Sequence, residues 1–369
     1  MYNIIFLLPL VAIVAILSFL TAYNIRKFII EYDLFPKKKD RDIHKLKVPS
    51  SLGIGFLIVF TVCTIFYQEN FINIVNYVAL IFTSFIIVAL GFLDDLNALS
   101  SKKKLLFQLI AIGIFLYFNE YLIINNLNFF LGISEISIIP ATIFTVFIGI
   151  VMINGLNLID GIDGFAAIIT IISSLCFALI FWGIGSRIPF LISILLAAIL
   201  LGYLPINISN KKKGFMGDSG SMYIGYMFFI LTLIFLQSDF TFLFNVIKTK
   251  SVLPLAPLSI YIIPILDTLS IYYYRFSIGK GPLSPDNFHL HHMMLYYINP
   301  SPFIVSLLAG AFIIIFCGVM SVVTFTFSAI IAISTYFILL FFLMVVILYF
   351  KSKMRSELGN TNGNVQKIE

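Results

Sequence analysis

Apolar segments long enough to cross a lipid bilayer dominate this sequence. From Asn287 to Phe350 the chain contains no Asp, Glu, Lys or Arg in 64 residues, whereas a helix needs only about 20 apolar residues to cross the hydrocarbon core. Similar segments recur along the whole chain, and we count eleven of them: 4–23, 51–67, 74–93, 105–123, 138–156, 165–182, 188–204, 219–236, 251–274, 301–320 and 323–350. The sequence therefore predicts an all-α, polytopic integral membrane protein.

Composition excludes the main alternatives. The chain is 60% hydrophobic and 11% charged, with a mean hydropathy of +1.06, whereas a typical soluble domain is about 25% charged. Too few polar residues are present to cover a water-soluble particle of this size. A soluble enzyme, a secreted disulfide scaffold and a disordered chain are excluded, and the three widely separated cysteines show neither a disulfide framework nor metal-ligand spacing.

The distribution of basic residues predicts the orientation. The first charged residue, Arg26, follows the first apolar segment, which indicates a retained helix with its N-terminus outside. In that orientation only three of the 23 Lys and Arg residues lie outside, namely Arg187, Lys248 and Lys250. The positive-inside rule then places the C-terminus in the cytoplasm. The net charge of +6 is accordingly assigned to membrane topology and not to nucleic-acid binding.

The chain is expected to form one domain and a short tail. Residues 1–350 contain the eleven apolar segments and no visible repeat, so we expect a single transmembrane domain. Residues 351–369 are polar and are expected to be a disordered cytoplasmic tail. Residues 119–137, which include four Asn residues, are expected to form an external loop.

Acidic side chains gather where apolar segments end on the inner side. Asp94 and Asp95 end the third segment, Asp160 and Asp163 end the fifth, and Asp218 begins the eighth. Hairpin connectivity brings these ends to one membrane face, where a carboxylate is costly without a partner. Carboxylate and amide oxygens suit Mg²⁺, which shares its coordination shell with phosphate. The alternative is a set of separately solvated helix ends, and three such clusters with flanking glycines argue against it.

Other polar residues complement the acids. Asn154 and Asn157 extend the acidic row at a spacing of three, which keeps neighbours adjacent on one side of a helix. Phe215, close to Asp218, is either a plain interfacial aromatic or a platform on which a base stacks. Lys104 opens the fourth segment, where a lysine can extend toward a lipid phosphate.

Three of the four histidines lie together, at His289, His291 and His292. No Cys or acid at zinc spacing accompanies them, so we favour hydrogen bonding of the imidazoles to a phosphate or sugar. The fourth, His44, lies in the first inner loop. Basic residues of that loop are further candidates for substrate contacts: Arg41 and Lys45.

These motifs resemble those of the bacterial polyprenyl-phosphate N-acetylhexosamine-1-phosphate transferases. That group belongs to glycosyltransferase family 4 and is related to phospho-N-acetylmuramoyl-pentapeptide transferase. The resemblance covers the second to tenth segments, and five motifs carry it: Asp94-Asp95, Asn154–Gly164, Gly217–Ser221, Pro264 with Asp267 and Arg275, and His289-x-His291-His292. The last pattern is typical of the hexosamine branch, whereas the muramoyl-pentapeptide branch tends to have three consecutive histidines.

The resemblance implies ten or eleven helices around a cytoplasmic cleft in the bacterial inner membrane. It implies chemical roles for Asp94, Asp95 and Asp160, and Mg²⁺ binding (with Mn²⁺ as an alternative ion) by Asp218 helped by Asn157. Nucleotide binding would involve Asp163, Phe215 and Asn154. Contacts to the lipid phosphate or sugar phosphate would involve Lys104, Arg275, His289, His291 and His292.

The implied reaction transfers N-acetylhexosamine 1-phosphate from a UDP-sugar to undecaprenyl phosphate, releases UMP and starts a lipid-linked cell-envelope glycan. GlcNAc is the expected sugar. Muramoyl-pentapeptide transfer is the alternative reaction. An ion-coupled transporter is the alternative of another class, although transporter acids lie near the membrane midplane. Whether Asp94 or Asp95 acts as a base or only positions metal and phosphate stays open, as do the downstream pathway and a homodimeric state.

Overall fold

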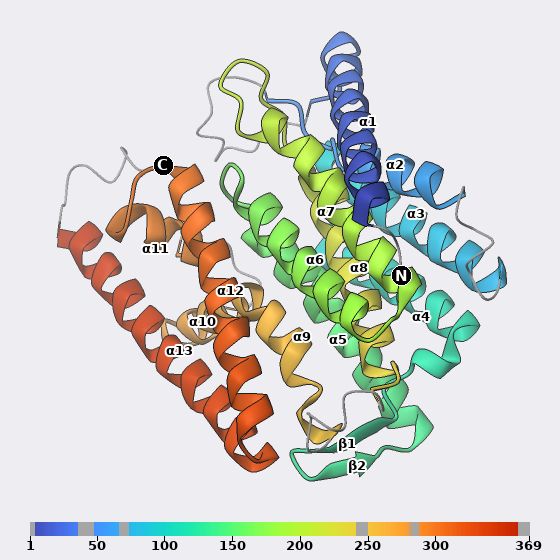
Figure 1. The fold of residues 1–369 in the computed structure, drawn as a ribbon. Helices are drawn as coiled ribbons and strands as arrows, with labels where there is room; N and C mark the ends of the chain where they lie inside the picture. Colours follow the sequence, from blue (N-terminus) through green and yellow to red (C-terminus); the bar gives the residue numbers. More distant parts are fainter. Residues whose placement is uncertain are drawn as a thin grey trace.

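Long helices run back and forth between two ends of the molecule in the computed structural model (Figure 1). The structure describes residues 4–35, 48–65, 74–240, 250–279, 281 and 288–360. Within this part of the chain, eight helices are long and apolar enough to cross a membrane: α1 (Ile4–Glu31), α3 (Ile74–Leu96), α5 (Ile138–Ile159), α6 (Phe165–Gly183), α7 (Arg187–Asn207), α8 (Gly217–Leu236), α12 (Pro302–Thr326) and α13 (Ala329–Asn360). The expected helical membrane protein is confirmed at this level.

The remaining helices are shorter or broken. The pair Lys250–Ile260 and Ile262–Ser277, which contains α9 (Leu255–Ile260) and α10 (Ile262–Ser277), is bent by 76° and counts as a ninth span if taken together. Shorter helices complete the described elements: α2 (Ile54–Ile65), α4 (Ser101–Phe118) and α11 (Leu290–Tyr297). Every one of the eleven apolar segments contains a helix, while eleven membrane crossings and their orientation stay predictions.

Two boundaries predicted near the C-terminus are wrong. The last two spans separate at Phe327 and Ser328, and not near residue 321, because the Ser321 hydroxyl donates to the Cys317 carbonyl within α12 and so fits a continuous helix. Helix α13 also continues to Asn360, so the first ten residues of the expected disordered tail are helical. Residues 361–369 lie outside the described part of the chain.

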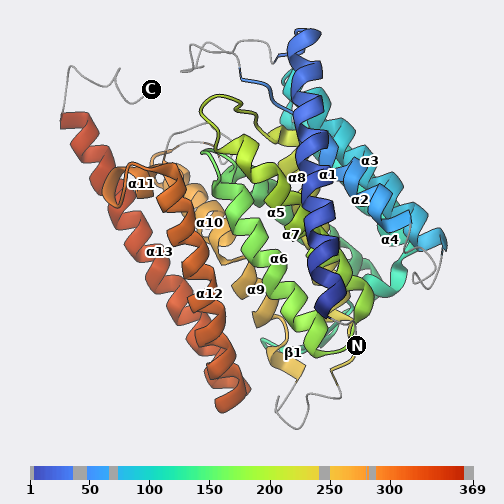
Figure 2. The ribbon, with the colours of Figure 1, turned by 45° about the horizontal axis from the view of Figure 1, so that its top comes forward.

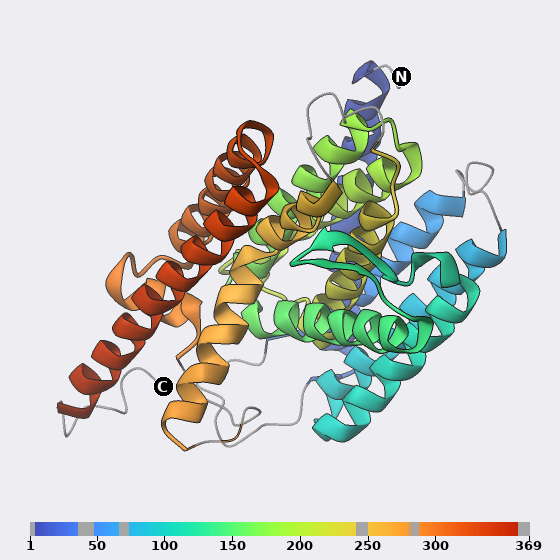
Figure 3. The ribbon, with the colours of Figure 1, turned by 90° about the horizontal axis from the view of Figure 1, so that it is seen from below.

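The expected external loop contains regular structure. A 3₁₀ turn at Glu120–Leu122 precedes an antiparallel hairpin of β1 (Asn126–Phe130) and β2 (Ile133–Glu135), in which Asn126 pairs with Glu135. Seen from below, the hairpin lies across the ends of neighbouring helices (Figure 3). Phe130 is buried against the bundle, whereas Phe129, Leu131 and Ile133 are exposed. The contact of Phe130 helps to order a segment whose Asn content suggested a simple loop.

Helix α8 is the centre of the bundle, and nearly all its side chains are buried, chiefly against α3 and α5. Close packing at its N-terminal end depends on glycines. A Cβ at Gly91 of α3 would overlap the backbone of Ser219, and a Cβ at Gly53 would overlap Gly220. Small residues that let helices approach closely are a normal means of packing in membranes. Here they bring the end of α3 directly against the start of α8.

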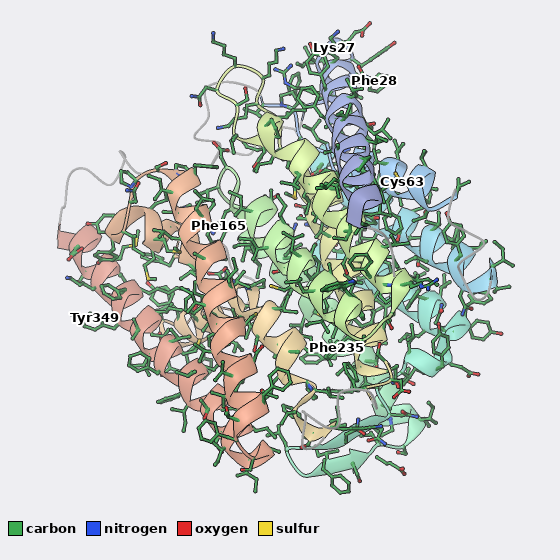
Figure 4. The ribbon with its side chains drawn as sticks, in the orientation of Figure 1. Lys27, Phe28, Cys63, Phe165, Phe235 and Tyr349 are labelled. Atoms are coloured by element: carbon green, nitrogen blue, oxygen red, sulfur yellow. The ribbon has the colours of Figure 1, made fainter. Side chains whose placement is uncertain are left out.

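The two ends of the molecule differ in what they carry. The N-terminal end of α1 lies at the end of the molecule opposite the C-terminal end of α13 (Figure 2). Lys27 and Phe165 lie toward the upper end, whereas Phe235, close to the C-terminal end of α8, lies lower (Figure 4). The upper end therefore holds the start of α8 and the end of α3, where the acidic motifs stand.

Thiol labelling tests the orientation of these ends. In a variant whose native Cys63, Cys176 and Cys317 are replaced by Ser, a cysteine introduced at Ser101 should react only after the cytoplasmic side is opened to a membrane-impermeant reagent. A cysteine at Asn126, on the exposed hairpin, should react in intact cells. The expectation follows from the distribution of basic residues. Labelling of both positions from the same side would contradict the proposed topology.

Candidate active site

A polar pocket of about 460 Å³ lies beside the N-terminal end of α8. Its lining comes from five stretches that lie far apart in the chain: Ser50, Asp95, Asn157, Asp160, Gly161, Ile162, Asp163, Asn207, Lys213, Phe215, Gly217, Asp218 and Pro302. A second pocket of about 430 Å³, among α6, α9 and α12, has no acidic or basic residue in its lining. Of these two pockets, only the one beside α8 is lined by charged side chains.

Asp95 binds the start of α8. Its Oδ1 accepts a hydrogen bond from the Asp218 backbone N–H at 2.9 Å, and its Oδ2 accepts from the Ser51 hydroxyl at 2.7 Å and more weakly from the Ser219 N–H at 3.4 Å. A carboxylate here satisfies unpaired amides and interacts favourably with the helix dipole. Gly217, with φ of +70°, is required because a Cβ at this position would overlap the Asp95 carboxylate.

Asp94, the neighbouring acid, has a different environment. The Lys104 ammonium lies between Asp94 Oδ2 at 2.5 Å and Asp218 Oδ2 at 2.8 Å. Asp218 Oδ1 accepts a hydrogen bond from Asn157 Nδ2 at 3.0 Å, and the same amide donates to the Ser221 hydroxyl at 2.8 Å. Residues of α3, α4, α5 and α8 thus converge on the Asp218 carboxylate.

Asp160 contributes a carboxylate without a partner. Within the described residues this side chain has no hydrogen bond or ion pair, whereas Asp163 forms an ion pair with Lys213 at 2.5 Å. Desolvation in the pocket and the negative charges of Asp218, Asp95 and Asp163 raise the pKa of Asp160 to about 7. A cation bound in the pocket would relieve this repulsion.

The donor atoms fit Mg²⁺ in kind. Asp218, Asn157 and Asp160 offer oxygen ligands in one pocket. Among the described residues, no three His, Cys, Asp or Glu side chains form a complete metal site. Mg²⁺ is usually held by one or two carboxylates together with water and substrate phosphate. The pocket therefore suits an ion whose coordination a phosphate substrate completes.

Phe215 also lines this pocket. The Lys213 ammonium is 5.8 Å from the centroid of its ring. Backbone hydrogen bonds hold the loop that carries it, because the Phe215 N–H donates to the Pro49 carbonyl at 2.8 Å and the Leu52 N–H donates to the Phe215 carbonyl at 3.1 Å. An aromatic ring, a cation and the Asp163 carboxylate thus lie together, a combination able to bind a planar polar ring.

The segment with His289, His291 and His292 packs against the residues that line the pocket, at Gly161. The His289 Nδ1 lies 2.8 Å from Asp267 Oδ2, and the buried His291 ring packs so closely on Gly161 that a Cβ there would overlap it. Burial lowers the pKa of His291 to about 3, with the neighbouring His292 contributing, so this imidazole is neutral. Neither of its ring nitrogens has a hydrogen-bond partner in the described part of the chain.

Comparison with known proteins supports the resemblance drawn from the motifs. The model of glycosyl transferase family 4 matches residues 77–236, which contain the double aspartate, the Asn154–Gly164 motif and the Gly217–Ser221 motif. This part of the chain therefore resembles glycosyl transferase family 4. The match agrees with the resemblance inferred from the motifs, and the chain is an enzyme of the transferase class.

Three relatives illustrate the similarity over a longer part of the chain. The decaprenyl-phosphate N-acetylglucosaminephosphotransferase of Mycolicibacterium smegmatis is 26% identical over 76% of this chain and 73% of its own length. The undecaprenyl-phosphate alpha-N-acetylglucosaminyl 1-phosphate transferase of Salmonella typhi is 28% identical over 78% of this chain and 76% of its own length. A probable undecaprenyl-phosphate N-acetylglucosaminyl 1-phosphate transferase of Bacillus subtilis is 31% identical over 58% of this chain and 57% of its own length.

The structure brings most of the candidate residues of the transferase together, with one exception among the asparagines. Asn154 does not line the pocket. Its amide group pairs with that of Gln108 through hydrogen bonds of 2.9 and 3.3 Å, about one helical turn away from Asn157 along α5. Arg275 is buried at the end of α10 and also lies outside the pocket lining. The candidates in the first loop lie outside the described residues: Arg41, His44 and Lys45.

Sequence reasoning missed three residues of the site. Ser51 binds Asp95, Lys213 pairs with Asp163, and the Asn207 side-chain oxygen accepts a hydrogen bond from the Gly164 N–H at 2.6 Å. Lys213 is the last of three consecutive lysines, which the sequence analysis attributed only to the positive-inside rule. Its place two residues before Phe215 was the one signal in the sequence that could have singled it out.

Proposed function

We propose that this chain is a family 4 transferase that moves N-acetylhexosamine 1-phosphate, with GlcNAc as the sugar, from a UDP-sugar to a polyprenyl phosphate in an Mg²⁺-dependent reaction. The observation that carries the proposal is the Lys104 ammonium held between Asp94 and Asp218 beside Asn157, at the edge of an acidic pocket. Relatives that act on decaprenyl or undecaprenyl phosphate, according to their names, support the lipid substrate.

The proposed step is a displacement at phosphorus. An oxygen of the lipid phosphate attacks the sugar-linked phosphorus, the bond from this phosphorus to the bridging oxygen breaks, and UMP leaves with that oxygen. Bound Mg²⁺, held by Asp218 and Asn157, would neutralise charge on the phosphates. Lys104 is placed to pair with a phosphate oxygen. The attacking phosphate carries about −1.5 charge or more at neutral pH, so the step needs no strong general base.

The remaining polar residues suit the other parts of a nucleotide sugar. Phe215 and Asp163 would bind the uracil, one by stacking and one by hydrogen bonding. The histidine segment, which packs against Gly161 of the pocket lining, would contact the sugar phosphate. A membrane enzyme is needed because one substrate is a lipid, and the distribution of basic residues supports a reaction on the cytoplasmic face of the inner membrane.

Two alternatives make different predictions. Muramoyl-pentapeptide transfer is disfavoured by the His289-x-His291-His292 pattern. An ion-coupled transporter is disfavoured because the acids of the pocket stand at helix ends: Asp95 near the end of α3, Asp160 directly after α5 and Asp218 at the start of α8. Purified protein should release UMP from UDP-GlcNAc only when undecaprenyl phosphate and Mg²⁺ are both present. A panel of UDP-sugars then identifies the donor, and no release from any of them would overturn the proposal.

Replacement of Phe215 tests the nucleotide site. Phe215→Leu should raise KM for the UDP-sugar about tenfold, because loss of base stacking costs roughly 1–3 kcal/mol. KM for the lipid phosphate should change little. Phe129→Leu, on the exposed tip of the hairpin, is the matched control. Steady-state kinetics with each substrate varied in turn make the comparison, and an unchanged donor KM in Phe215→Leu would remove the residue from the site.

A further inference from the structure

Lys351 of α13 is completely excluded from solvent, although it begins the polar end of the sequence. Its Nζ donates a hydrogen bond to the Ser270 hydroxyl of α10 at 2.7 Å. A buried ammonium in a membrane-spanning helix is expensive unless an opposite charge and hydrogen bonds compensate it. Its neighbour Lys353 shows the ordinary alternative, an exposed side chain paired with Glu357.

The compensating charge is Asp267, which is also fully buried on α10. Lys351 and Asp267 attract each other electrostatically. Ser270 links them further, because its hydroxyl accepts from Lys351 and donates to the Asp267 backbone carbonyl at 3.1 Å. The last helix is therefore tied to the part of α10 that carries the Pro-x-x-Asp motif.

Asp267 in turn holds the beginning of the histidine segment. Its Oδ2 pairs with His289 Nδ1 at 2.8 Å, and its Oδ1 accepts a hydrogen bond from the Leu290 N–H at 2.6 Å. The His289 and His291 rings are parallel within 4°, with centroids 5.6 Å apart. Since His291 packs on Gly161 of the pocket, an unbroken series of contacts leads from α13 to the acidic pocket.

We propose that Lys351 is a positioning residue for donor binding. Its buried charge stabilises and orients the Asp267 carboxylate, which keeps His289 and His291 against the wall of the pocket where the sugar phosphate would bind. The kinetic part of the inference rests on the proposed function. Lys351 belongs to none of the five sequence motifs and lies outside the residues matched by the family model.

The test compares full-length Lys351→Met and Lys351→Arg with the control Lys353→Met, two residues along the same helix. Lys351→Met should raise the UDP-GlcNAc KM about tenfold, the scale of one hydrogen bond to a charged group. KM for undecaprenyl phosphate should stay within about twofold. Lys351→Arg should recover most of the donor affinity, because it restores the charge. Amide hydrogen exchange of the peptide 288–297 should be faster in Lys351→Met and unchanged in Lys353→Met.

Several results would overturn the proposal: equal changes in both KM values, failure of Arg to restore donor binding, or unchanged hydrogen exchange in Lys351→Met. If Lys351→Met does not fold, the double variant Lys351→Met with Asp267→Asn removes both buried charges. This double variant should fold and should still have a raised KM for UDP-GlcNAc. A wild-type donor KM in the double variant would also contradict the positioning role of Lys351. If the wild-type protein transfers no sugar from any UDP-sugar, the proposed function fails, while the exchange comparison still decides whether Lys351 positions the histidine segment.

Discussion

Asp218→Asn is expected to lower kcat by on the order of 10³-fold, because loss of a metal-ligand charge removes several kcal/mol of transition-state stabilisation. The amide keeps the shape of the side chain but is an uncharged and weaker ligand for Mg²⁺. Among the described residues, it also leaves Lys104 with only Asp94 as an acidic partner, and it weakens the contact with Asn157. The effect is therefore expected on chemistry more than on folding.

The measurement is UMP release over a range of Mg²⁺ concentrations, together with the Tm of the purified variant. Glu120→Gln is the control, because it also removes one negative charge, from an exposed residue near the hairpin. The Tm of Asp218→Asn should remain close to that of the wild type. Near-normal turnover at ordinary Mg²⁺ would show that Asp218 is not the metal ligand, and Asp160 would then be the next residue to test.

Asp95→Ala is expected to reduce both activity and stability. The side chain caps α8, and loss of an N-terminal cap costs about 0.5–2 kcal/mol. Because Asp218 is the second residue of that helix, a small shift of its start would misplace the carboxylate, and a displacement of about 1 Å can cost about 10²-fold in rate. Asp94→Asn should lower the rate through Lys104 and should lower the Tm less than Asp95→Ala does.

A pH–rate profile distinguishes positioning from general-base catalysis for this pair. If Asp94 and Asp95 only position other groups, each variant should lose rate by a similar factor at every pH, and raised Mg²⁺ should restore part of it. If Asp94 or Asp95 abstracts a proton, the corresponding variant, Asp94→Asn or Asp95→Asn, should lose a larger factor in rate at high pH, where the wild-type carboxylate is ionised. Wild-type rates and Tm in both variants would contradict either role and leave the pair as a solvated helix end.

Much of the architecture follows from the sequence because the bilayer acts on each segment separately. A long apolar run must form a helix in lipid, since no water is present to satisfy its backbone. The eleven apolar segments therefore all contain helices. The motifs likewise contain the residue types that phosphate chemistry needs, and Asp160, Asp163 and Asp218 meet in one pocket as their position at helix ends predicted.

The tertiary structure decided what depends on how helices pack. Asp94 and Asp95 are identical neighbours in the sequence, yet one pairs with Lys104 and the other caps α8, because successive positions on α3 point in different directions. Gly161, which in the sequence is only a glycine beside Asp160, makes room for the His291 ring. Lys351, expected in a polar tail, is buried against α10. Helix association in membranes depends on close fit and small residues more than on a hydrophobic pattern, so these long-range contacts leave almost no local signal in the sequence.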